Sequence, residues 1–186
     1  LVFTVVFGGI AGLSPGGVPD FLFYMAGNTI WLYFSTCITN TSSTFIANSR
    51  IFGKVYFPRL TMPIATVIFA LISFFVQFAL FIILLVIMKL TGAAVHPNAW
   101  IAITPLLIVE VAMLGLGTGI IVSSLTTKYR DLQMLVSFGV QLWMYATPVV
   151  YDVATVNGLH IPQWIKSVYM LNPMTPVVAT FRYEYL

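Results

Sequence analysis

The sequence has few charged residues. Only 7% of its 186 residues are Asp, Glu, Lys or Arg, whereas an ordinary soluble domain has about 25%. Because 60% of the residues are hydrophobic, no water-soluble surface can be built from this composition. A helix that crosses a bilayer needs roughly 20 mainly apolar residues, and such stretches recur along almost the whole chain. We therefore expect an all-α, polytopic integral membrane protein with a single transmembrane domain over residues 1–186.

The residues that build metal and disulfide sites are also scarce. Cys37 is the only cysteine, so it cannot form an intramolecular disulfide, and inside an apolar segment it is expected to be a small packed side chain. His96 and His160 lie far apart with no metal-ligand spacing around them. The sequence predicts no metal site and no cofactor in this chain.

Catalytic and nucleotide-binding patterns are missing as well. Gly53-Lys54 is followed by Val55 and lacks the upstream glycine of a phosphate-binding loop, so the chain is not expected to bind ATP in that way. No paired carboxylates and no nucleophile with a base suggest an enzyme. The eight basic residues form no dense stripe with interleaved aromatics, which argues against nucleic-acid binding.

Apolar segments predict five membrane spans, and a sixth is expected to begin near the C-terminus. The five are residues 1–13, 21–44, 62–88, 100–125 and 133–151, and the start of the last span is placed at 177–186. Because the chain opens on Leu1 and stops soon after a helix-like run, we expect both ends to belong to a longer protein. Pro162, Pro173 and Pro176 interrupt residues 152–176, which predicts two short, re-entrant helices at the outer mouth.

Basic residues set the predicted orientation. Arg50, Lys54 and Arg59 lie in residues 45–60 without an acidic residue to balance them, and Lys128 and Arg130 lie in the loop after the fourth span. The number of spans between the two loops places them on one side, which should be the cytoplasm. Membrane anchoring alone would also explain these charges.

Two features within the spans need partners. Glu110 is the only acidic residue deep within a predicted span, so it is expected to face the protein interior or to be protonated, with Lys89 and Thr104 as candidate partners. The pairs Gly8/Gly12 and Gly115/Gly119 have the GxxxG spacing that permits close approach of helices.

Four blocks, read together, indicate a family. They are NSRIFGKVYFPR at 48–59, KYRDL at 128–132, YATPVVY at 145–151 and LNPMTPVVATFR at 171–182. In this order they resemble the permease subunits of type-2 ABC exporters that move polysaccharides, a family that includes exporters of O-antigen, capsular polysaccharide and teichoic acid.

The resemblance implies a multi-pass permease of the bacterial inner membrane that exports a lipid-linked glycan. It would act as a homodimer with two separate ABC ATPase subunits, and these would bind the ATP and Mg. The first block matches the coupling segment that contacts the ATPase: Asn48, Arg50, Ile51, Phe52, Lys54, Tyr56, Phe57 and Arg59. The second block is expected to brace the cytoplasmic side: Lys128, Tyr129, Arg130 and Asp131.

A conduit for sugars also needs aromatic faces on which sugar rings can stack and slide. The candidate path residues are Trp31, Tyr33, Phe34, Trp143 and Tyr145, although packing or a place in the interfacial aromatic belt also explains each of them. The segment from 151 to 176 is expected to gate the outer exit. The residues assigned to this gate are Pro148, Tyr151, Asn172, Pro173 and Pro176.

Two other functions stay open from the sequence. A type-2 ABC exporter of a small molecule or lipid would share the architecture without a wide aromatic conduit. A proton-coupled secondary transporter would depend on Glu110 and need no ATPase, but the inverted repeat of many such folds is missing.

Overall fold

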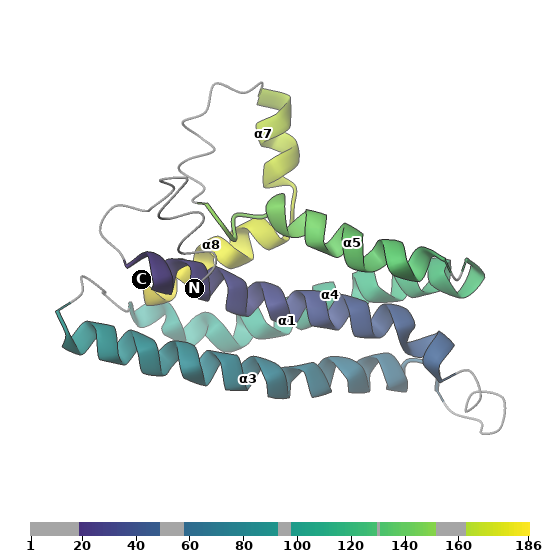
Figure 1. Ribbon diagram of the computed structural model, residues 1–186, viewed down its shortest axis with the longest axis horizontal. Coiled ribbons are helices and arrows are strands. Elements are labelled where there is room, and N and C mark those ends of the chain that lie inside the picture. The colour runs from purple at the N-terminus through teal and green to yellow at the C-terminus, as the bar shows by residue number, and fades with distance from the viewer. Residues whose placement is uncertain (1–18, 49–57, 93–97, 130, 152–162) are drawn as a thin grey trace.

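The protein is a bundle of long helices with two short helices at one side (Figure 1). The computed structural model describes residues 19–48, 58–92, 98–129, 131–151 and 163–186. Within these residues every regular element is helical, which confirms the all-α class. The elements are α1 (Asp20–Ala47), α3 (Thr61–Leu90), η2 (Ala99–Ile103), α4 (Thr104–Lys128), α5 (Leu132–Tyr145), α7 (Gln163–Met170) and α8 (Met174–Tyr185).

Three helices are long and apolar enough to cross a membrane. They are Asp20–Ala47 with 28 residues, Thr61–Leu90 with 30 and the continuous stretch Trp100–Lys128 with 29. They coincide with the predicted spans 21–44, 62–88 and 100–125 to within a few residues at each end. The predicted span 1–13 lies outside the described residues.

Helix α5 is shorter than predicted. The span was expected to reach residue 151, but the helix has 14 residues and ends at Tyr145, a length of about 21 Å. Pro148 has no backbone N–H and cannot continue the hydrogen-bond ladder. Residues 146–151 form turns and a bend instead, and side chains from elsewhere satisfy their carbonyl groups, as described below.

The predicted bend near the C-terminus is present. Helix α7 has 8 residues and α8 has 12, and Leu171–Pro173 separate them. Figure 1 shows α7 projecting away from the long helices while α8 lies against them. At about 18 Å, α8 by itself is too short to cross a bilayer, so the start of a last span at 177–186 stays a prediction.

Helix α1 is the centre of the bundle. It packs against α3, α4, α5 and α8. In its most apolar 18-residue stretch 67% of the residues are buried, against 17% in α3, so α3 presents most of its surface outward. Although α1 is rich in Ser and Thr, most of their hydroxyls are satisfied locally: those of Thr36 and Thr44 donate to the carbonyls of Leu32 and Asn40, four residues earlier, at 2.7 Å each. This makes a polar helix compatible with burial. The buried Thr41 hydroxyl has no partner within the described residues.

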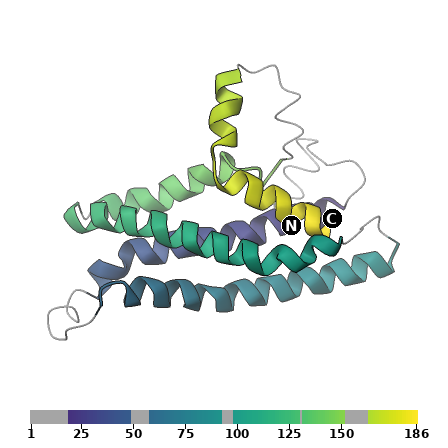
Figure 2. The ribbon, with the colours of Figure 1, turned by 180° about the vertical axis from the view of Figure 1, so that it is seen from behind.

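Close packing of α1 against α4 depends on glycine. A Cβ atom added at Gly115 would lie 2.6 Å from the Cβ of Cys37, and one at Gly119 would lie 2.6 Å from the Cβ of Thr41. Figure 2 shows α4 running along α1 for much of its length. The close approach predicted from the second GxxxG pair is confirmed, and Cys37 is a packed side chain. Gly8 and Gly12 lie outside the described residues.

The ends of the helices agree with the predicted sidedness. Figures 1 and 2 show that the C-terminal ends of α1 and α4 and the N-terminal ends of α3 and α5 lie at the same end of the bundle. Both basic loops therefore connect helix ends at this end of the bundle. We call this the basic end, and the opposite end, where α8 packs against the start of α4, the outer end.

Glu110 does not face the interior of the chain. Its side chain is exposed on α4, whose packed face is formed by Leu107, Val111 and Gly115. The candidate partner Thr104 bonds elsewhere, because its hydroxyl donates to Oε2 of the buried Glu184 at 2.7 Å. The prediction that Glu110 faces the interior was therefore wrong for the single chain. Neighbouring residues of a helix differ by about 100° in direction, and the sequence did not show which side of α4 the other helices would cover.

Candidate functional site

A cluster of hydrogen bonds at the outer end centres on Arg182 of α8. This residue is 7% exposed. Nη1 donates to the carbonyls of Pro148 at 2.6 Å and Tyr151 at 3.1 Å, and Nη2 donates to the carbonyl of Val149 at 2.5 Å. One side chain therefore satisfies three carbonyl groups of the turn that follows α5. It fastens the 147–151 turn to α8.

Helix α1 completes the pocket that holds this guanidinium. The central carbon of the Arg182 guanidinium lies 3.6 Å from the ring centroid of Phe23, a cation–π contact. A Cβ atom at Gly27 would lie 2.5 Å from Nη2 of Arg182 and 3.0 Å from the carbonyl oxygen of Val149. Gly27 thus leaves the space in which α1, α8 and the turn meet.

Asn172 makes a second connection between the same elements. Its Nδ2 donates to the carbonyl of Ala146 at 3.1 Å and to the hydroxyl of Thr147 at 2.9 Å. Its Oδ1 accepts hydrogen bonds from Nε1 of Trp143 and from the backbone N–H of Met174, both at 3.1 Å. The Asn-Pro pair therefore starts α8 and ties it to the end of α5.

The structure gathers most of the predicted gate residues here. The carbonyls of Pro148 and Tyr151 bind Arg182, and the Tyr151 hydroxyl donates to the carbonyl of Tyr145 at 3.0 Å. Pro173 directly precedes α8, and Pro176 is exposed in its first turn, where a missing N–H costs nothing. We call Arg182, Asn172 and the 147–151 turn the outer clasp. Whether it gates an exit stays a prediction.

Arg182 was missed as a site residue, although it ends one of the four sequence blocks. The signal that could have found it is a single basic residue within the apolar run VVATFRYEYL, because a charge in such a run usually has a buried partner. The partners are three main-chain carbonyls, which no side-chain pattern reveals.

Replacing Asn172 with alanine is expected to lower stability by about 2–3 kcal/mol, because four hydrogen bonds are lost and each is worth roughly 0.5–1.5 kcal/mol. Asn172→Asp keeps the acceptor but not the donor, so we expect an intermediate loss. Thermal unfolding in detergent, followed by Trp143 fluorescence, measures both. Equal stability of Asn172→Ala and the wild type would contradict this role of the amide.

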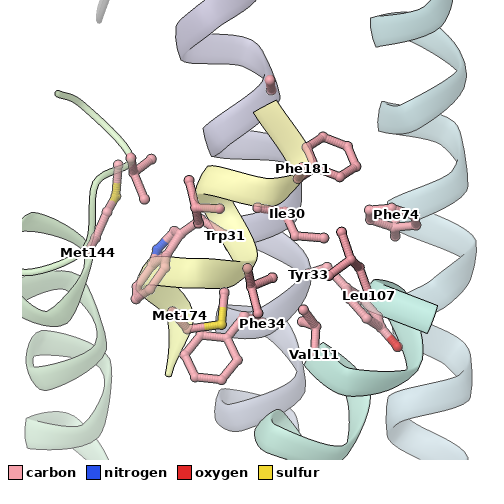
Figure 3. Close-up of a cluster of buried hydrophobic side chains, with 14 of the residues drawn as sticks. Ile30, Trp31, Tyr33, Phe34, Phe74, Leu107, Val111, Met144, Met174 and Phe181 are labelled. Carbon is pink, nitrogen blue, oxygen red and sulfur yellow. The ribbon is translucent and has the colours of Figure 1, made fainter. Parts of the chain in front are cut away.

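The candidate path aromatics are mainly core residues (Figure 3). Trp31 and Tyr33 are 2% exposed and Phe34 is 0% exposed. Trp143 packs edge-on against Phe34 and Trp31, with centroids 5.2 and 6.5 Å apart. The faces of the three α1 rings are covered by protein in this structure, so they are not available for stacking on a sugar. Tyr145, at 50% exposed, is the most accessible of the five.

The basic end is described in part. Asn48 ends α1, and its Nδ2 donates to the carbonyl of Thr44 at 2.9 Å. Arg59 and Asp131 are exposed. The Nζ of Lys128 lies 5.3 Å from the ring centroid of Tyr129. The remaining predicted coupling and bracing residues lie outside the described part of the chain: Arg50, Ile51, Phe52, Lys54, Tyr56, Phe57 and Arg130.

Comparison with known proteins agrees with this architecture. The family described as ABC-2 type transporter matches residues 1–186. An "O-antigen export system permease protein RfbA" of Klebsiella pneumoniae is 27% identical over 166 residues, which cover 89% of this chain and 61% of the relative. A protein with the same description from Myxococcus xanthus is 27% identical over 185 residues, covering 98% of this chain and 65% of the relative. The chain thus spans less than two thirds of these relatives.

Proposed function

The chain belongs to the ABC-2 type transporter family, and on that premise we propose that it is the permease subunit of an ATP-driven exporter of lipid-linked polysaccharide in the bacterial inner membrane. The observation that carries the proposal is the similarity to O-antigen export permeases over 89% and 98% of this chain. Three long apolar helices around a packed centre suit a membrane subunit that is not itself catalytic.

The energy would come from a partner. Two copies of the permease would form the path, and two separate ABC ATPase subunits would bind ATP and Mg at the basic end. The segment 48–59 would receive the movement of the ATPase. Binding of the ATPase then biases the permease between two states through contacts that differ in those states.

Helix α1 is suited to carry this movement across the membrane. Its C-terminal end leads directly into the coupling segment, and its N-terminal part holds Gly27 and Phe23 against the outer clasp. The helix is 28 residues long, about 42 Å, and it packs against four other helices. A displacement at the basic end would therefore reach the 147–151 turn through one rigid element.

We expect an ABC ATPase to be captured at the basic end of the complete natural protein. Arg59→Cys places a thiol on an exposed residue of the coupling segment, and Trp100→Cys, 55% exposed in the wild type, places one at the outer end as a control. Both variants carry Cys37→Ala. Crosslinking in membranes with a bifunctional thiol reagent, followed by mass spectrometry, should identify an ATPase on the first variant and not on the second.

The crosslinking result is combined with a second measurement, the amount of surface glycan after depletion of the protein. Together they separate the candidate functions. Loss of glycan together with a captured ATPase supports the proposal. A captured ATPase with unchanged glycan would indicate an exporter of a smaller cargo. Transport without any ATPase would contradict the proposal and direct attention to Glu110 as the residue of a proton-coupled transporter.

A further inference from the structure

The exposed surface of α5 carries a row of neutral polar side chains. Gln133, Ser137 and Gln141 follow at four-residue spacing, Tyr145 continues the series, and all of them are exposed. Four residues turn an α-helix by roughly 400° and advance it by about 6 Å, so the series winds slowly along one side of the helix. We call these four residues the polar row.

The amides and the serine hydroxyl of this row have no partners among the described residues. Gln133, Ser137 and Gln141 make no hydrogen bond within the part of the chain that the structure describes. Several hydroxyls on the long helices bond back to their own helix instead, as Thr118 does to the carbonyl of Leu114 at 2.7 Å. An amide left bare in hydrocarbon is costly, and polar groups in spans usually face a protein interior or a water-filled cavity. A polar neighbour outside the described residues would satisfy the row.

The row borders the packed side of α5. Val140 and Met144, which mark that side, are 7% and 9% exposed. On the other border lie the exposed apolar residues Met134 and Phe138. At about 100° per residue, Ser137 and Gln141 fall between these two sides, whereas Gln133 lies in the direction of Val140 and Met144, and Tyr145 in that of Met134 and Phe138. Ser137 and Gln141 therefore flank the packed side and do not point straight into surrounding lipid.

We propose that the polar row lines the export path and hydrogen-bonds to the hydroxyl groups of the passing glycan; this rests on the proposed function. Amides and hydroxyls both donate and accept hydrogen bonds, as sugar hydroxyls do. The row has no charged group that would hold a polymer too tightly to release it. Its repeat of about 6 Å offers one polar group for roughly each sugar unit of an extended chain.

A second copy of this chain is a poorer occupant for the row. Helices that pair closely in membranes do so through small residues, as Gly115 and Gly119 do between α4 and α1. In the polar row only Ser137 is small. The long side chains of Gln133 within the row and of Met134 and Phe138 beside it would keep the backbone of a second copy at a distance.

Two measurements on the complete transporter in native membranes test the proposal. In the first, Ser137→Cys and Gln141→Cys, each with Cys37→Ala, are treated with a small hydrophilic maleimide. Ser73→Cys on the outward surface of α3 is the matched control. We expect the α5 thiols to react at least tenfold faster, because thiols react as thiolates and need water to form them.

In the second measurement, the double variant Gln133→Leu and Gln141→Leu is compared with Gln77→Leu on α3. We expect surface glycan to fall about tenfold for the double variant, since two or more hydrogen bonds are lost, and to stay unchanged for the control. ATPase capture at Arg59→Cys should persist in both.

Each other result overturns the proposal. Unreactive α5 thiols would show that no water reaches the row, and disulfides between copies without maleimide reaction would make it a dimer contact. Reactive thiols with unchanged glycan would show a wet surface that the glycan does not need. If depletion of the wild-type protein leaves surface glycan intact, the proposed function itself fails, whatever the maleimide rates show.

Discussion

Replacing Arg182 with methionine is expected to destabilise the protein by about 3–5 kcal/mol, since the substitution leaves three carbonyl oxygens of the 147–151 turn, two of them buried, without donors. Methionine fills a similar volume, so the loss reports the hydrogen bonds and the contact with Phe23 rather than an empty space. The turn would separate from α8, and export should stop.

The matched comparison for this site is Arg182→Lys. Lysine keeps the charge, but a single ammonium lacks the planar fork that reaches three carbonyls at once, so we expect most of the loss to remain. Limited proteolysis at the 147–151 turn and thermal unfolding in detergent measure the effect. A fully stable Arg182→Lys variant would show that charge alone, and not the geometry of the guanidinium, holds the outer clasp.

Replacing Gly119 with alanine is expected to cost about 2–3 kcal/mol, because overpacking a tight contact typically costs 1–3 kcal/mol and here the new methyl group meets atoms close to a backbone. The added Cβ would lie 2.6 Å from the Cβ of Thr41 and 2.8 Å from its Cγ2. Thr41 cannot rotate its own Cβ away, so α1 and α4 must separate.

Gly117→Ala on the same helix is the control. A Cβ at Gly117 meets nothing within 4 Å, and alanine favours a helix over glycine by about 1 kcal/mol. Gly117→Ala should therefore match or exceed the wild type in unfolding temperature while Gly119→Ala falls well below it. Equal effects of the two substitutions would contradict close packing of α4 on α1.

Some of the site could be predicted because its signals are local. The proline at Pro173 predicted a break among the C-terminal helices, and the separation of α7 from α8 agrees with this. The end of α5 before Pro148 was not predicted. The spacing of Gly115 and Gly119 predicted a close helix contact, and the contact is with Cys37 and Thr41 of α1.

Other features could not be predicted, because they depend on which side of a helix its neighbours cover. Trp31 and Phe34 were assigned to a substrate path on residue type, yet both lie in the core against Trp143. Glu110 was expected to face inward and is exposed, whereas Glu184 is the buried carboxylate and bonds Thr104.

By itself the sequence determined that this protein is helical and crosses a membrane, since only 7% of its residues are charged and its apolar runs of roughly 20 residues satisfy their backbone hydrogen bonds in a bilayer as helices. It also predicted the bend before α8, because proline lacks a backbone donor, but not the early end of α5. Only the tertiary structure decided that α1 is central, that Arg182 holds the 147–151 turn and that the polar row of α5 stays uncovered. Those facts follow from the positions of main-chain carbonyls and neighbouring helices, which arise only when segments distant in the chain pack together.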